Sequence, residues 1–275
     1  MARIAVLQMT SGIDPAVNAA VIVEAIGRAA EGGAAMLFTP EMSGLLDRDR
    51  ERARAHIVLE SENPVLAAAR AAAAERGIWV AIGSLAVKRA DGRWANRSFL
   101  IDADGKIAAR YDKIHMFDVQ LETGETWRES AAYGAGDRAA VAETPVGRLG
   151  LTICYDVRFP ALFEELGQQL CDVIAVPAAF TVPTGKAHWH VLQRARAIEA
   201  SAYVVAAAQV GRHADGRETY GHSLLVDPWG EVLLDLGGEE PGLGFAEIDP
   251  VRIAQVRRQL PSLANRRPIL RSSGS

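Results

Sequence analysis

The chain has 275 residues, of which 49% are apolar and 23% charged, and its formal net charge at pH 7 is −4. This length can bury a full hydrophobic core, and the composition is ordinary for a soluble globular protein. Lysine and arginine are scattered among aspartate and glutamate, so the sequence lacks the basic stretches that bind nucleic acid or an anionic membrane.

Short apolar strands alternate with helical patterns through the first half of the chain. Asp14-Pro15 predicts the start of a helix that ends at Gly32 or Gly33, and Asn63-Pro64 opens an alanine-rich helix that Gly77 ends. The segment 93–111 predicts a β-hairpin that turns at Asp104-Gly105, a dipeptide favoured in type I′ turns. The predicted strands are "IAVLQM" (4–9), "AMLFTPE" (35–41) and "IWVAIGS" (78–84).

The second half repeats this order. A hairpin over 222–236 is expected to turn at "DPWG", and Asp249-Pro250 opens a final helix that stops before Pro261. The predicted strands are 149–154, 172–177 and 203–209, and the predicted helices are 160–170 and 185–202.

The two halves together predict the fold class. Each half runs strand, helix, strand, helix, strand and then hairpin, so the chain is expected to be a pseudo-repeat of α/β units in one domain, 1–271, with a flexible tail at 272–275. The nearly continuous apolar strands indicate sheets covered by helices. Two similar halves favour sheet packed against sheet, with the helices outside.

Three reactive side chains follow predicted strands, where open α/β folds bind their ligands. Glu41 follows "AMLFTP", Lys113 follows "IAARYD", and Cys154 ends "LGLTIC". Each alone has an ordinary explanation, as a solvated glutamate, a surface lysine or a small buried cysteine. An acid, an amine and a thiol after three separate strands favour catalysis over coincidence.

Three segments carry a family resemblance. "TPEMSG", "YDKIHMFD" and "GLTICYDVRFP" resemble the three catalytic blocks of the nitrilase, or carbon–nitrogen hydrolase, superfamily. The likeness continues through 184–213, "YGHSLLVDPWGEV" and "RRQLPSLANRRPIL", and so covers essentially the whole chain. These later blocks look most like the branch that hydrolyses the amide of deaminated glutathione. The resemblance implies a four-layer α-β-β-α sandwich.

The resemblance also implies roles for individual residues. It assigns Cys154 as the nucleophile, Glu41 as the general base and Lys113 as the stabiliser of the transition state. A second glutamate of the family falls after the lysine block, and "WRES" best matches its pattern, which assigns that role to Glu129. The competing positions are Glu122 and Glu125.

These residue types suit amide hydrolysis. Only a thiolate attacks, and a free cysteine has a pKa of about 8.5, so a nearby ammonium and a proton-accepting carboxylate make attack possible at neutral pH. Attack creates an oxyanion, which Lys113 and a backbone N–H following the nucleophile could stabilise. Glu41 would pass the proton to the departing ammonia and then take one from the water that hydrolyses the thioester.

Four further residues are candidate substrate contacts. Arg158 lies four residues past the nucleophile, and its planar guanidinium suits a carboxylate at the far end of a substrate. In the resembling amidases the matching arginine lies in the substrate pocket. The alternative for Arg158 is a salt bridge to Asp156 or Glu164. The other three candidates, expected to line the same pocket, are Tyr155, Phe180 and Thr184.

Histidines offer weaker alternatives. His188 and His190 lie two residues apart, which on a helix points them to different faces, so packing or hydrogen bonding is favoured over zinc binding. His115 or His222 could pair with Cys154 as in papain-like enzymes, but neither lies in a signature for that family. The sequence contains no GxSxG, P-loop or G-x-G-x-x-G motif.

The sequence thus predicts a cysteine amidase without cofactor or metal, which hydrolyses a small ω-amide, deaminated glutathione first, to a carboxylate and ammonia through a thioester. An ω-amidase acting on 2-oxoglutaramate or 2-oxosuccinamate is the nearest alternative, followed by a nitrilase or carbamoyl hydrolase. Two other classes stay open. One is a catalytically silent sandwich that serves as a binding module, and the other is a metallohydrolase built on His188 and His190.

The N-terminal sequence, the lengths of the apolar stretches and the two cysteines predict the cellular compartment and the partners of the protein. "MARIAVLQM" lacks the apolar core and cleavage site of a signal peptide, and no apolar stretch approaches the roughly 20 residues that span a bilayer. The two cysteines, Cys154 and Cys171, are therefore expected to be reduced in a cytoplasmic protein. The expected partner is a small amide, with no nucleic acid and no membrane, and the resemblance implies a homodimer or higher homo-oligomer.

Overall fold

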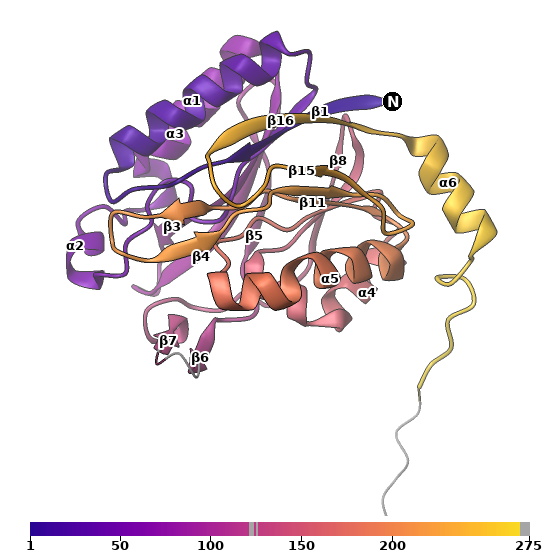
Figure 1. Ribbon diagram of the computed structural model, residues 1–275. Helices are drawn as coiled ribbons and strands as arrows, with labels where there is room; N and C mark the ends of the chain where they lie inside the picture. The colour runs from indigo at the N-terminus through magenta and orange to yellow at the C-terminus, as the bar shows by residue number, and fades with distance from the viewer. Residues whose placement is uncertain (121–123, 125, 270–275) are drawn as a thin grey trace, which may run out of the picture.

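Two six-stranded sheets face each other in the computed structural model, which describes residues 1–120, 124 and 126–269, and helices cover both outer faces (Figure 1). Helices α1 (Pro15–Glu31) and α3 (Pro64–Arg76) cover one sheet, and α4 (Pro160–Gln168) and α5 (Val182–Ala200) cover the other. The predicted α-β-β-α sandwich is confirmed. The tail predicted at 272–275 lies outside the described residues.

The first sheet has the strand order β16-β1-β2-β3-β4-β5. Its three central strands β1, β2 and β3 run parallel, and β4, β5 and β16 pair antiparallel with their neighbours. The strands are β1 (Ala2–Gln8), β2 (Met36–Phe38), β3 (Trp79–Lys88), β4 (Trp94–Ile101), β5 (Ile107–Asp112) and β16 (Gly242–Ile248).

The second sheet repeats this plan with the order β15-β14-β11-β10-β9-β8. Strands β9, β10 and β11 run parallel, and β8, β14 and β15 are antiparallel to their neighbours. The predicted pseudo-repeat is therefore present, with α1 and α3 matched by α4 and α5. The strands are β8 (Ala140–Thr144), β9 (Gly147–Leu151), β10 (Val173–Ala175), β11 (Tyr203–Ala206), β14 (Leu224–Val226) and β15 (Val232–Asp235).

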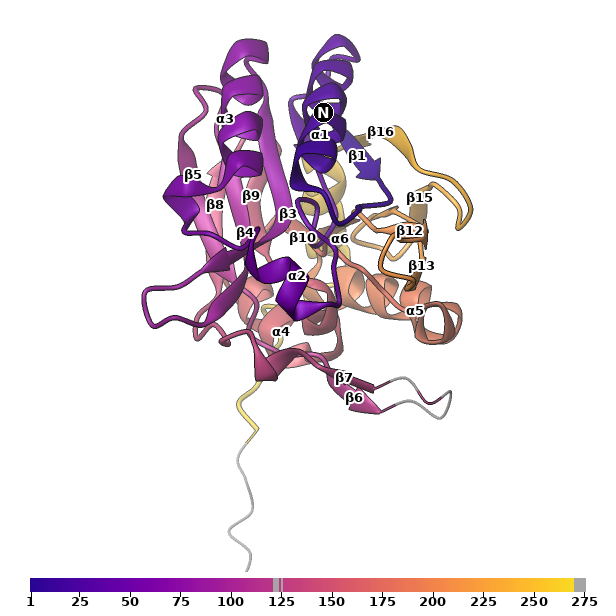
Figure 2. The ribbon, with the colours of Figure 1, turned by 90° about the vertical axis from the view of Figure 1, so that its left-hand side faces the viewer.

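Burial explains the near-continuous apolar strands. Strands β2, β10, β11 and β14 are buried at every position, because each has a sheet neighbour on both sides and packed layers above and below. One apolar cluster fills the space between the sheets and beneath α4 and α5, and a second lies beneath α1 and α3. Figure 2 shows these last two helices side by side on the first sheet.

Smaller elements gather at one end of the sandwich, the end that faces the viewer in Figure 2. The pairs β6–β7 and β12–β13 and the short helix α2 lie there, and α6 follows β16 at the other end (Figure 1). The bounds are α2 (Arg50–Arg54), β6 (Asp118–Gln120), β7 (Thr126–Arg128), β12 (Val210–Arg212), β13 (Glu218–Tyr220) and α6 (Pro250–Gln259), with 3-10 turns at Glu60–Glu62, Glu129–Ala131 and Cys154–Arg158.

Several expected elements have other bounds in the structure, and the strands predicted at 35–41 and 203–209 are shorter than expected. Strand β9 ends at Leu151, three residues before Cys154, and α5 begins at Val182 rather than 185. The hairpin between β4 and β5 turns through three residues, because Ile101 pairs with Ile107 and Asp102 bonds Lys106. Only Gly105 in this turn has positive φ, at 75°, so the predicted type I′ turn, which needs two such residues, is wrong.

Candidate active site

A cavity of about 600 Å³ opens at the end of the sandwich where the small elements gather. Glu41, Lys113 and Cys154, the three residues singled out after strands, all line it. They follow β2, β5 and β9, so the sheets bring together side chains that are 72 and 41 positions apart in the chain. Each is almost fully buried, with 5%, 2% and 8% of its surface exposed.

Residues of both sheets contact the loop that carries Glu41 and hold its backbone in place. Gly83 Cα lies so near the Thr39 carbonyl that an added Cβ would come within 2.1 Å of that oxygen and 2.5 Å of Pro177, so only glycine fits there. The Gln209 amide, after β11, donates to the Glu41 carbonyl at 2.9 Å. The carboxylate therefore projects into the cavity from a rigid backbone.

Lys113 lies between two carboxylates. Its Nζ donates to Glu41 Oε1 at 2.9 Å and to Glu129 Oε2 at 2.9 Å. Burial alone would lower the pKa of Lys113, but the charges of Glu129 and Glu41 hold that pKa well above its ordinary value. The ammonium therefore stays charged at the floor of the cavity.

Asn96, on β4, joins the two carboxylates and is a residue that the sequence analysis missed. Its amide nitrogen donates to Glu41 Oε1 at 2.9 Å and to Glu129 Oε1 at 3.0 Å. The backbone N–H of Ala179 donates to the other oxygen of Glu41 at 2.9 Å. Burial alone would raise the pKa of Glu41, but the charge of Lys113 and these bonds hold that pKa below its ordinary value.

Cys154 begins a single 3-10 turn with a left-handed backbone, at φ 48°. Such a conformation is unusual for a residue with a side chain and is held here by the Cys154 N–H, which donates to the Pro177 carbonyl at 2.8 Å. Burial and the charge of Glu41 raise the pKa of the thiol well above its ordinary value, against the opposing effect of Lys113. The resting pair is thus a neutral thiol beside a charged carboxylate.

The turn after Cys154 is tied to the segment after Lys113 by Asp156, which is fully buried. One oxygen accepts from the backbone N–H of His115 at 3.0 Å and contacts its ring Nδ1 at 2.7 Å. The other accepts from the Tyr111 hydroxyl at 2.7 Å and the Ile153 N–H at 2.9 Å. Asp156 therefore fixes the position of Cys154 relative to Lys113.

Comparison with known proteins agrees with this geometry. The sequence profile of the carbon-nitrogen hydrolase family matches residues 3–258. The chain belongs to the carbon–nitrogen hydrolase family. The deaminated glutathione amidase of Yersinia enterocolitica is 40% identical over 272 residues, which cover 97% of this chain and 93% of the relative.

Two solved structures extend the likeness. The NitFhit protein of C. elegans matches with a TM-score of 0.89 at 37% identity, over 97% of this chain and 66% of that one. A mutant amidase from Nesterenkonia sp. AN1 matches with a TM-score of 0.79 at 28% identity, over 95% of this chain and 98% of that one, and carries acrylamide added to its active-site cysteine. The chain is therefore a hydrolase of carbon–nitrogen bonds other than peptide bonds, as predicted.

The cavity of this carbon–nitrogen hydrolase includes three of the four predicted substrate contacts. Tyr155, Phe180 and Thr184 line it. Arg158 is not among the lining residues. Its guanidinium lies 5.2 Å from the Phe180 ring centre and 5.9 Å from that of Tyr155, and both of these residues line the cavity.

Arg158 also lacks the partners named for it as an alternative. Its Nη1 lies 3.2 Å from His188 Nδ1, and in the described part of the chain it forms no ion pair with Asp156 or Glu164. Asp156 is instead occupied by Tyr111 and His115.

Other arginines line the cavity where Arg158 was expected. Arg217, before β13, is half-buried, held by Asp215 at 2.7 Å, and its guanidinium lies 5.0 Å from the Trp127 ring centre. The indole Nε1 of Trp127 is buried and has no hydrogen-bond partner among the described residues. The remaining arginines on the wall are Arg48, Arg50 and Arg128.

The other sequence candidates lie apart from the thiol. His115 contacts Asp156, and His222 contacts Asp235 at 2.9 Å. The competing glutamates Glu122 and Glu125 lie outside the described residues. Within the described ranges, no helix is both long and apolar enough to cross a membrane.

Proposed function

We propose that this hydrolase cleaves the ω-amide of deaminated glutathione, with Cys154 as nucleophile, Glu41 as general base and Lys113 as the stabiliser of the oxyanion. The observation that carries the proposal is the buried carboxylate–ammonium–thiol cluster at the floor of an arginine-lined cavity. The curated relative of Y. enterocolitica, named for this activity, supports the choice of substrate.

Acylation begins from the neutral thiol. Glu41, a carboxylate with a lowered pKa beside a thiol with a raised one, accepts the proton only as the sulfur attacks the amide carbonyl. The charge that develops on the carbonyl oxygen lies near the Lys113 ammonium and the backbone N–H after Cys154. One such donor is typically worth about 3 kcal/mol of transition-state stabilisation.

Glu41 passes protons in both halves of the reaction. It gives the proton from the thiol to the departing amine, and this step completes acylation with an acyl thioester on Cys154. Water then enters, loses a proton to Glu41 and attacks the thioester carbonyl, and Glu41 returns that proton to the sulfur as the C–S bond breaks. The product departs as a carboxylic acid, which releases its remaining proton to the solvent as the carboxylate forms. Glu129 acts through Lys113, since its carboxylate and that of Glu41 hold the ammonium from two sides.

The leaving group depends on the substrate. The scissile amide of deaminated glutathione joins a 2-oxoglutaryl group to cysteinylglycine, so the dipeptide leaves as an amine. Ammonia, the product expected from the sequence, would leave only from primary amides such as 2-oxoglutaramate. A cavity of about 600 Å³ is within the range that holds drug-sized ligands, which gives room for the dipeptide.

The arginines on the cavity wall fit the charge of this substrate. Deaminated glutathione carries a carboxylate at each end, and guanidinium groups bind carboxylates through paired hydrogen bonds. Arg217 is the best placed, because Asp215 and Trp127 hold its side chain at the wall. We assign it the role that the sequence gave to Arg158, whose substrate contact stays a prediction.

Product analysis across a panel of amides tests the proposal. We expect the highest kcat/KM with deaminated glutathione, a lower value with 2-oxoglutaramate, and an acyl adduct on Cys154 by mass spectrometry when substrate is mixed with enzyme. Preference for 2-oxoglutaramate would instead favour the ω-amidase alternative. Hydrolysis of nitriles alone, or of none of these compounds, would contradict the proposal.

Two further expectations belong to the same proposal. A homodimer or higher oligomer follows from the family resemblance and is tested by light scattering on the purified protein. A cytoplasmic location is tested by fractionating cells that express the chain.

Activity that persists after dialysis against a strong chelator would remove the metallohydrolase alternative on His188 and His190.

A further inference from the structure

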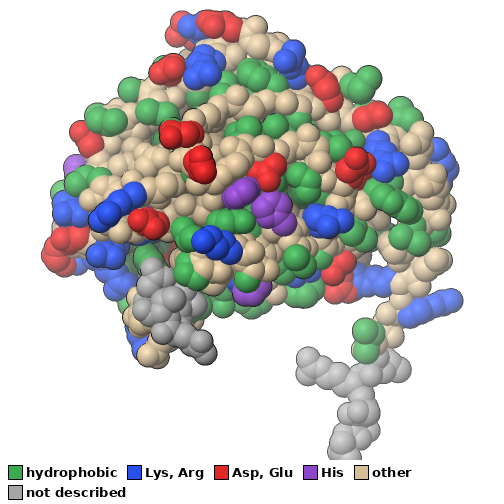
Figure 3. Space-filling view, viewed as in Figure 1, with side chains coloured by type: hydrophobic (Ala, Val, Ile, Leu, Met, Phe, Trp, Pro, Cys, Tyr) green, Lys and Arg blue, Asp and Glu red, His purple; other side chains and the backbone are tan. Residues whose placement is uncertain are grey.

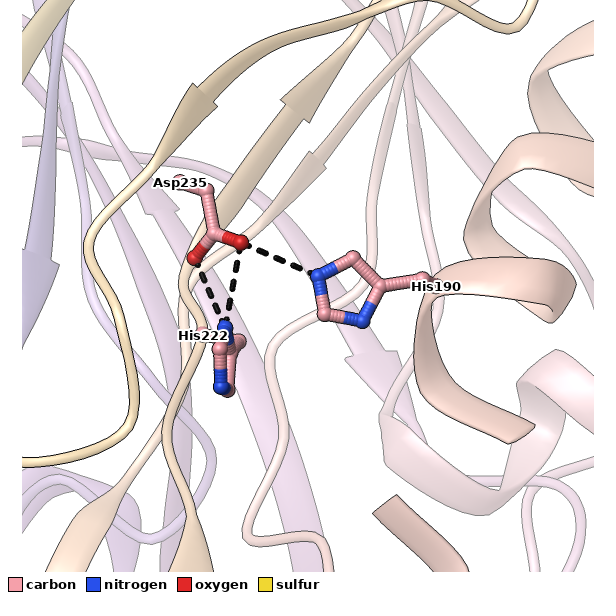
Figure 4. Close-up of side chains that lie close together, drawn as sticks. All are labelled: His190, His222 and Asp235. Carbon is pink, nitrogen blue, oxygen red and sulfur yellow. Dashed lines mark hydrogen bonds and ion pairs between the residues drawn. The ribbon is translucent and has the colours of Figure 1, made fainter. Parts of the chain in front are cut away.

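Two histidines and an aspartate meet on the second sheet, away from the catalytic cluster (Figure 4). His190 projects from α5, His222 precedes β14, and Asp235 ends β15. His190 Nε2 lies 3.0 Å from Asp235 Oδ2, and His222 Nδ1 lies 2.9 Å from Asp235 Oδ1. Among the described residues, this is the one group of three or more histidine, cysteine or acidic side chains close enough to share an ion.

The cluster of His190, His222 and Asp235 is accessible to solvent. Histidine side chains gather in the middle of the face shown in Figure 3, between the strands of the second sheet and α5. The side chains of His190, His222 and Asp235 are 34%, 25% and 32% exposed. An ion from solution could therefore reach all three.

Neighbouring groups orient Asp235 and His222, two of the three residues in the cluster. Asp235 Oδ1 also accepts from the Gly237 N–H at 2.9 Å, and the His222 N–H donates to the Gly237 carbonyl at 2.7 Å. His222 has a left-handed backbone, at φ 53°, and its ring stacks on Tyr220 with centres 4.5 Å apart. Contacts of this kind orient metal ligands and raise their affinity.

The catalytic site does not explain this arrangement. Neither histidine contacts Glu41, Lys113 or Cys154, and none of the three cluster residues lines the cavity. His188, two residues before His190, pairs with Arg158 instead. The sequence could not bring Asp235 into the set, because that residue lies on a hairpin 45 positions beyond His190.

We propose that His190, His222 and Asp235 bind a divalent transition-metal ion, with a water molecule as fourth ligand. Two imidazoles and one carboxylate suit Zn²⁺ in tetrahedral geometry. Neighbouring ligands of such an ion lie about 3.3 Å apart for bonds of about 2.0 Å, close to the 2.9–3.1 Å between the Asp235 oxygens and the histidine nitrogens.

Binding needs only a local change in the protons. Each imidazole now directs a ring nitrogen at the carboxylate, and an ion in that place would bond to the nitrogen lone pairs while the ring proton of each neutral imidazole moves to its other nitrogen. The ion would join α5 to the β14–β15 hairpin and so favour the folded state.

Zn²⁺ titration of the full chain tests the site. After dialysis against a chelator, calorimetry and elemental analysis should show one ion bound per chain at pH 7.5, and Co²⁺ should give the visible spectrum of a four-coordinate ion. His190→Ala and Asp235→Asn should each weaken binding at least about tenfold, the minimum typical of lost contacts around a metal. His188→Ala, the matched control on the same helix, should bind like the wild type.

Two further measurements keep the result interpretable. Cys154→Ala should retain the ion, which excludes binding to the active-site thiol. His222→Asn should fold normally, because asparagine tolerates the left-handed backbone, yet lose the ion. The melting temperature should rise with Zn²⁺ in the wild type and in His188→Ala but not in His190→Ala. No binding at micromolar Zn²⁺, or equal binding in His190→Ala and Asp235→Asn, would overturn the proposal.

Discussion

The floor of the cavity and its outer wall are built differently. The floor consists of Glu41, Lys113 and Cys154, and Asn96 donates to two carboxylates from behind it. All four residues lie in a sheet strand or within three residues of its end and expose no more than 8% of their surface. The wall carries Arg48, Arg128 and Arg217 on the connections and small strands around α2, β6–β7 and β12–β13, half-buried or exposed. The sheet strands thus position the residues that we propose for the reaction, and connections between elements carry the arginines that we propose to contact the rest of the substrate.

The two regions also differ in electrostatics. Charges on the floor are shielded from water, so each strongly shifts its neighbours' pKa values, as Lys113 does for Glu41. Charges on the wall are partly screened by solvent, and a contact there is worth less. Substitutions on the floor should therefore change the rate of chemistry for every amide, whereas substitutions on the wall should change which amide is preferred.

The largest effect is expected at Cys154. Cys154→Ala removes the proposed nucleophile and should reduce kcat to background while the melting temperature stays near that of the wild type. Cys171, the other buried cysteine, enters β10 far from the cavity, so Cys171→Ala should leave kcat nearly unchanged. Steady-state kinetics on both variants decide the matter, and substantial turnover by Cys154→Ala would refute the cysteine mechanism.

Glu41→Gln should lower kcat by roughly 10²- to 10⁴-fold, the range for a general acid–base group. Glutamine keeps the shape and one acceptor oxygen but cannot take the thiol proton or return one to the departing amine. The loss should be similar for deaminated glutathione and for a small neutral amide, since the floor acts on the amide itself. A normal rate in this variant would require another base, and His115 would be reconsidered.

Lys113 should influence how kcat/KM depends on pH, because its positive charge lowers the pKa of Glu41. In the wild type Glu41 has a lowered pKa and acts as a carboxylate, so kcat/KM should stay level through neutral pH and fall only at acid pH, as Glu41 is protonated. Lys113→Ala should lower kcat by about 10²- to 10³-fold through the lost oxyanion donor. It should also raise the pKa of Glu41 and move the acid limb of the pH–rate profile to higher pH. An acid limb that does not move would mean that Lys113 does not set the charge of Glu41.

The sequence predicted the floor better than the wall for a physical reason. Glu41 and Cys154 directly follow apolar runs, and local patterns report such positions well. Asn96 was missed because a polar residue inside a strand looks the same whether it faces solvent or, as here, two buried carboxylates. Only the pairing of β4 with β3 and β5 turns it inward.

Local sequence patterns also failed to predict the parts of the fold that depend on contacts between distant segments. Local periodicity located the longer helices, the central strands and the two hairpins that supply the edge strands β5 and β15, but not the edge strands β16 and β8. Strand β16 pairs with β1 over seven residues from the opposite end of the chain, and β8 lies at the edge of the second sheet. The Arg217–Trp127 pair likewise joins strand β7 to the connection before β13, 90 positions farther along the chain. Contacts of this length depend on the assembled sandwich, so no local pattern announces them.

The smallest effect is expected on the wall, where Arg217→Lys should lower kcat/KM for deaminated glutathione by about 10- to 100-fold, the worth of one charge-assisted contact. Lysine keeps the positive charge but loses both the planar fork and the stacking on Trp127. The value for propionamide, which has no carboxylate, should hardly change.

Arg158→Lys is the matched control for that variant, because Arg158 does not line the cavity and pairs with His188. We expect less than about fivefold loss with either substrate, as for a partly exposed contact. A larger loss in Arg158→Lys than in Arg217→Lys, confined to the carboxylated amide, would restore the sequence-based assignment of Arg158. An equal loss of kcat/KM with both amides in Arg217→Lys would mean that this arginine supports the cavity wall and does not bind the substrate carboxylate. The wall and the floor would then differ in burial alone.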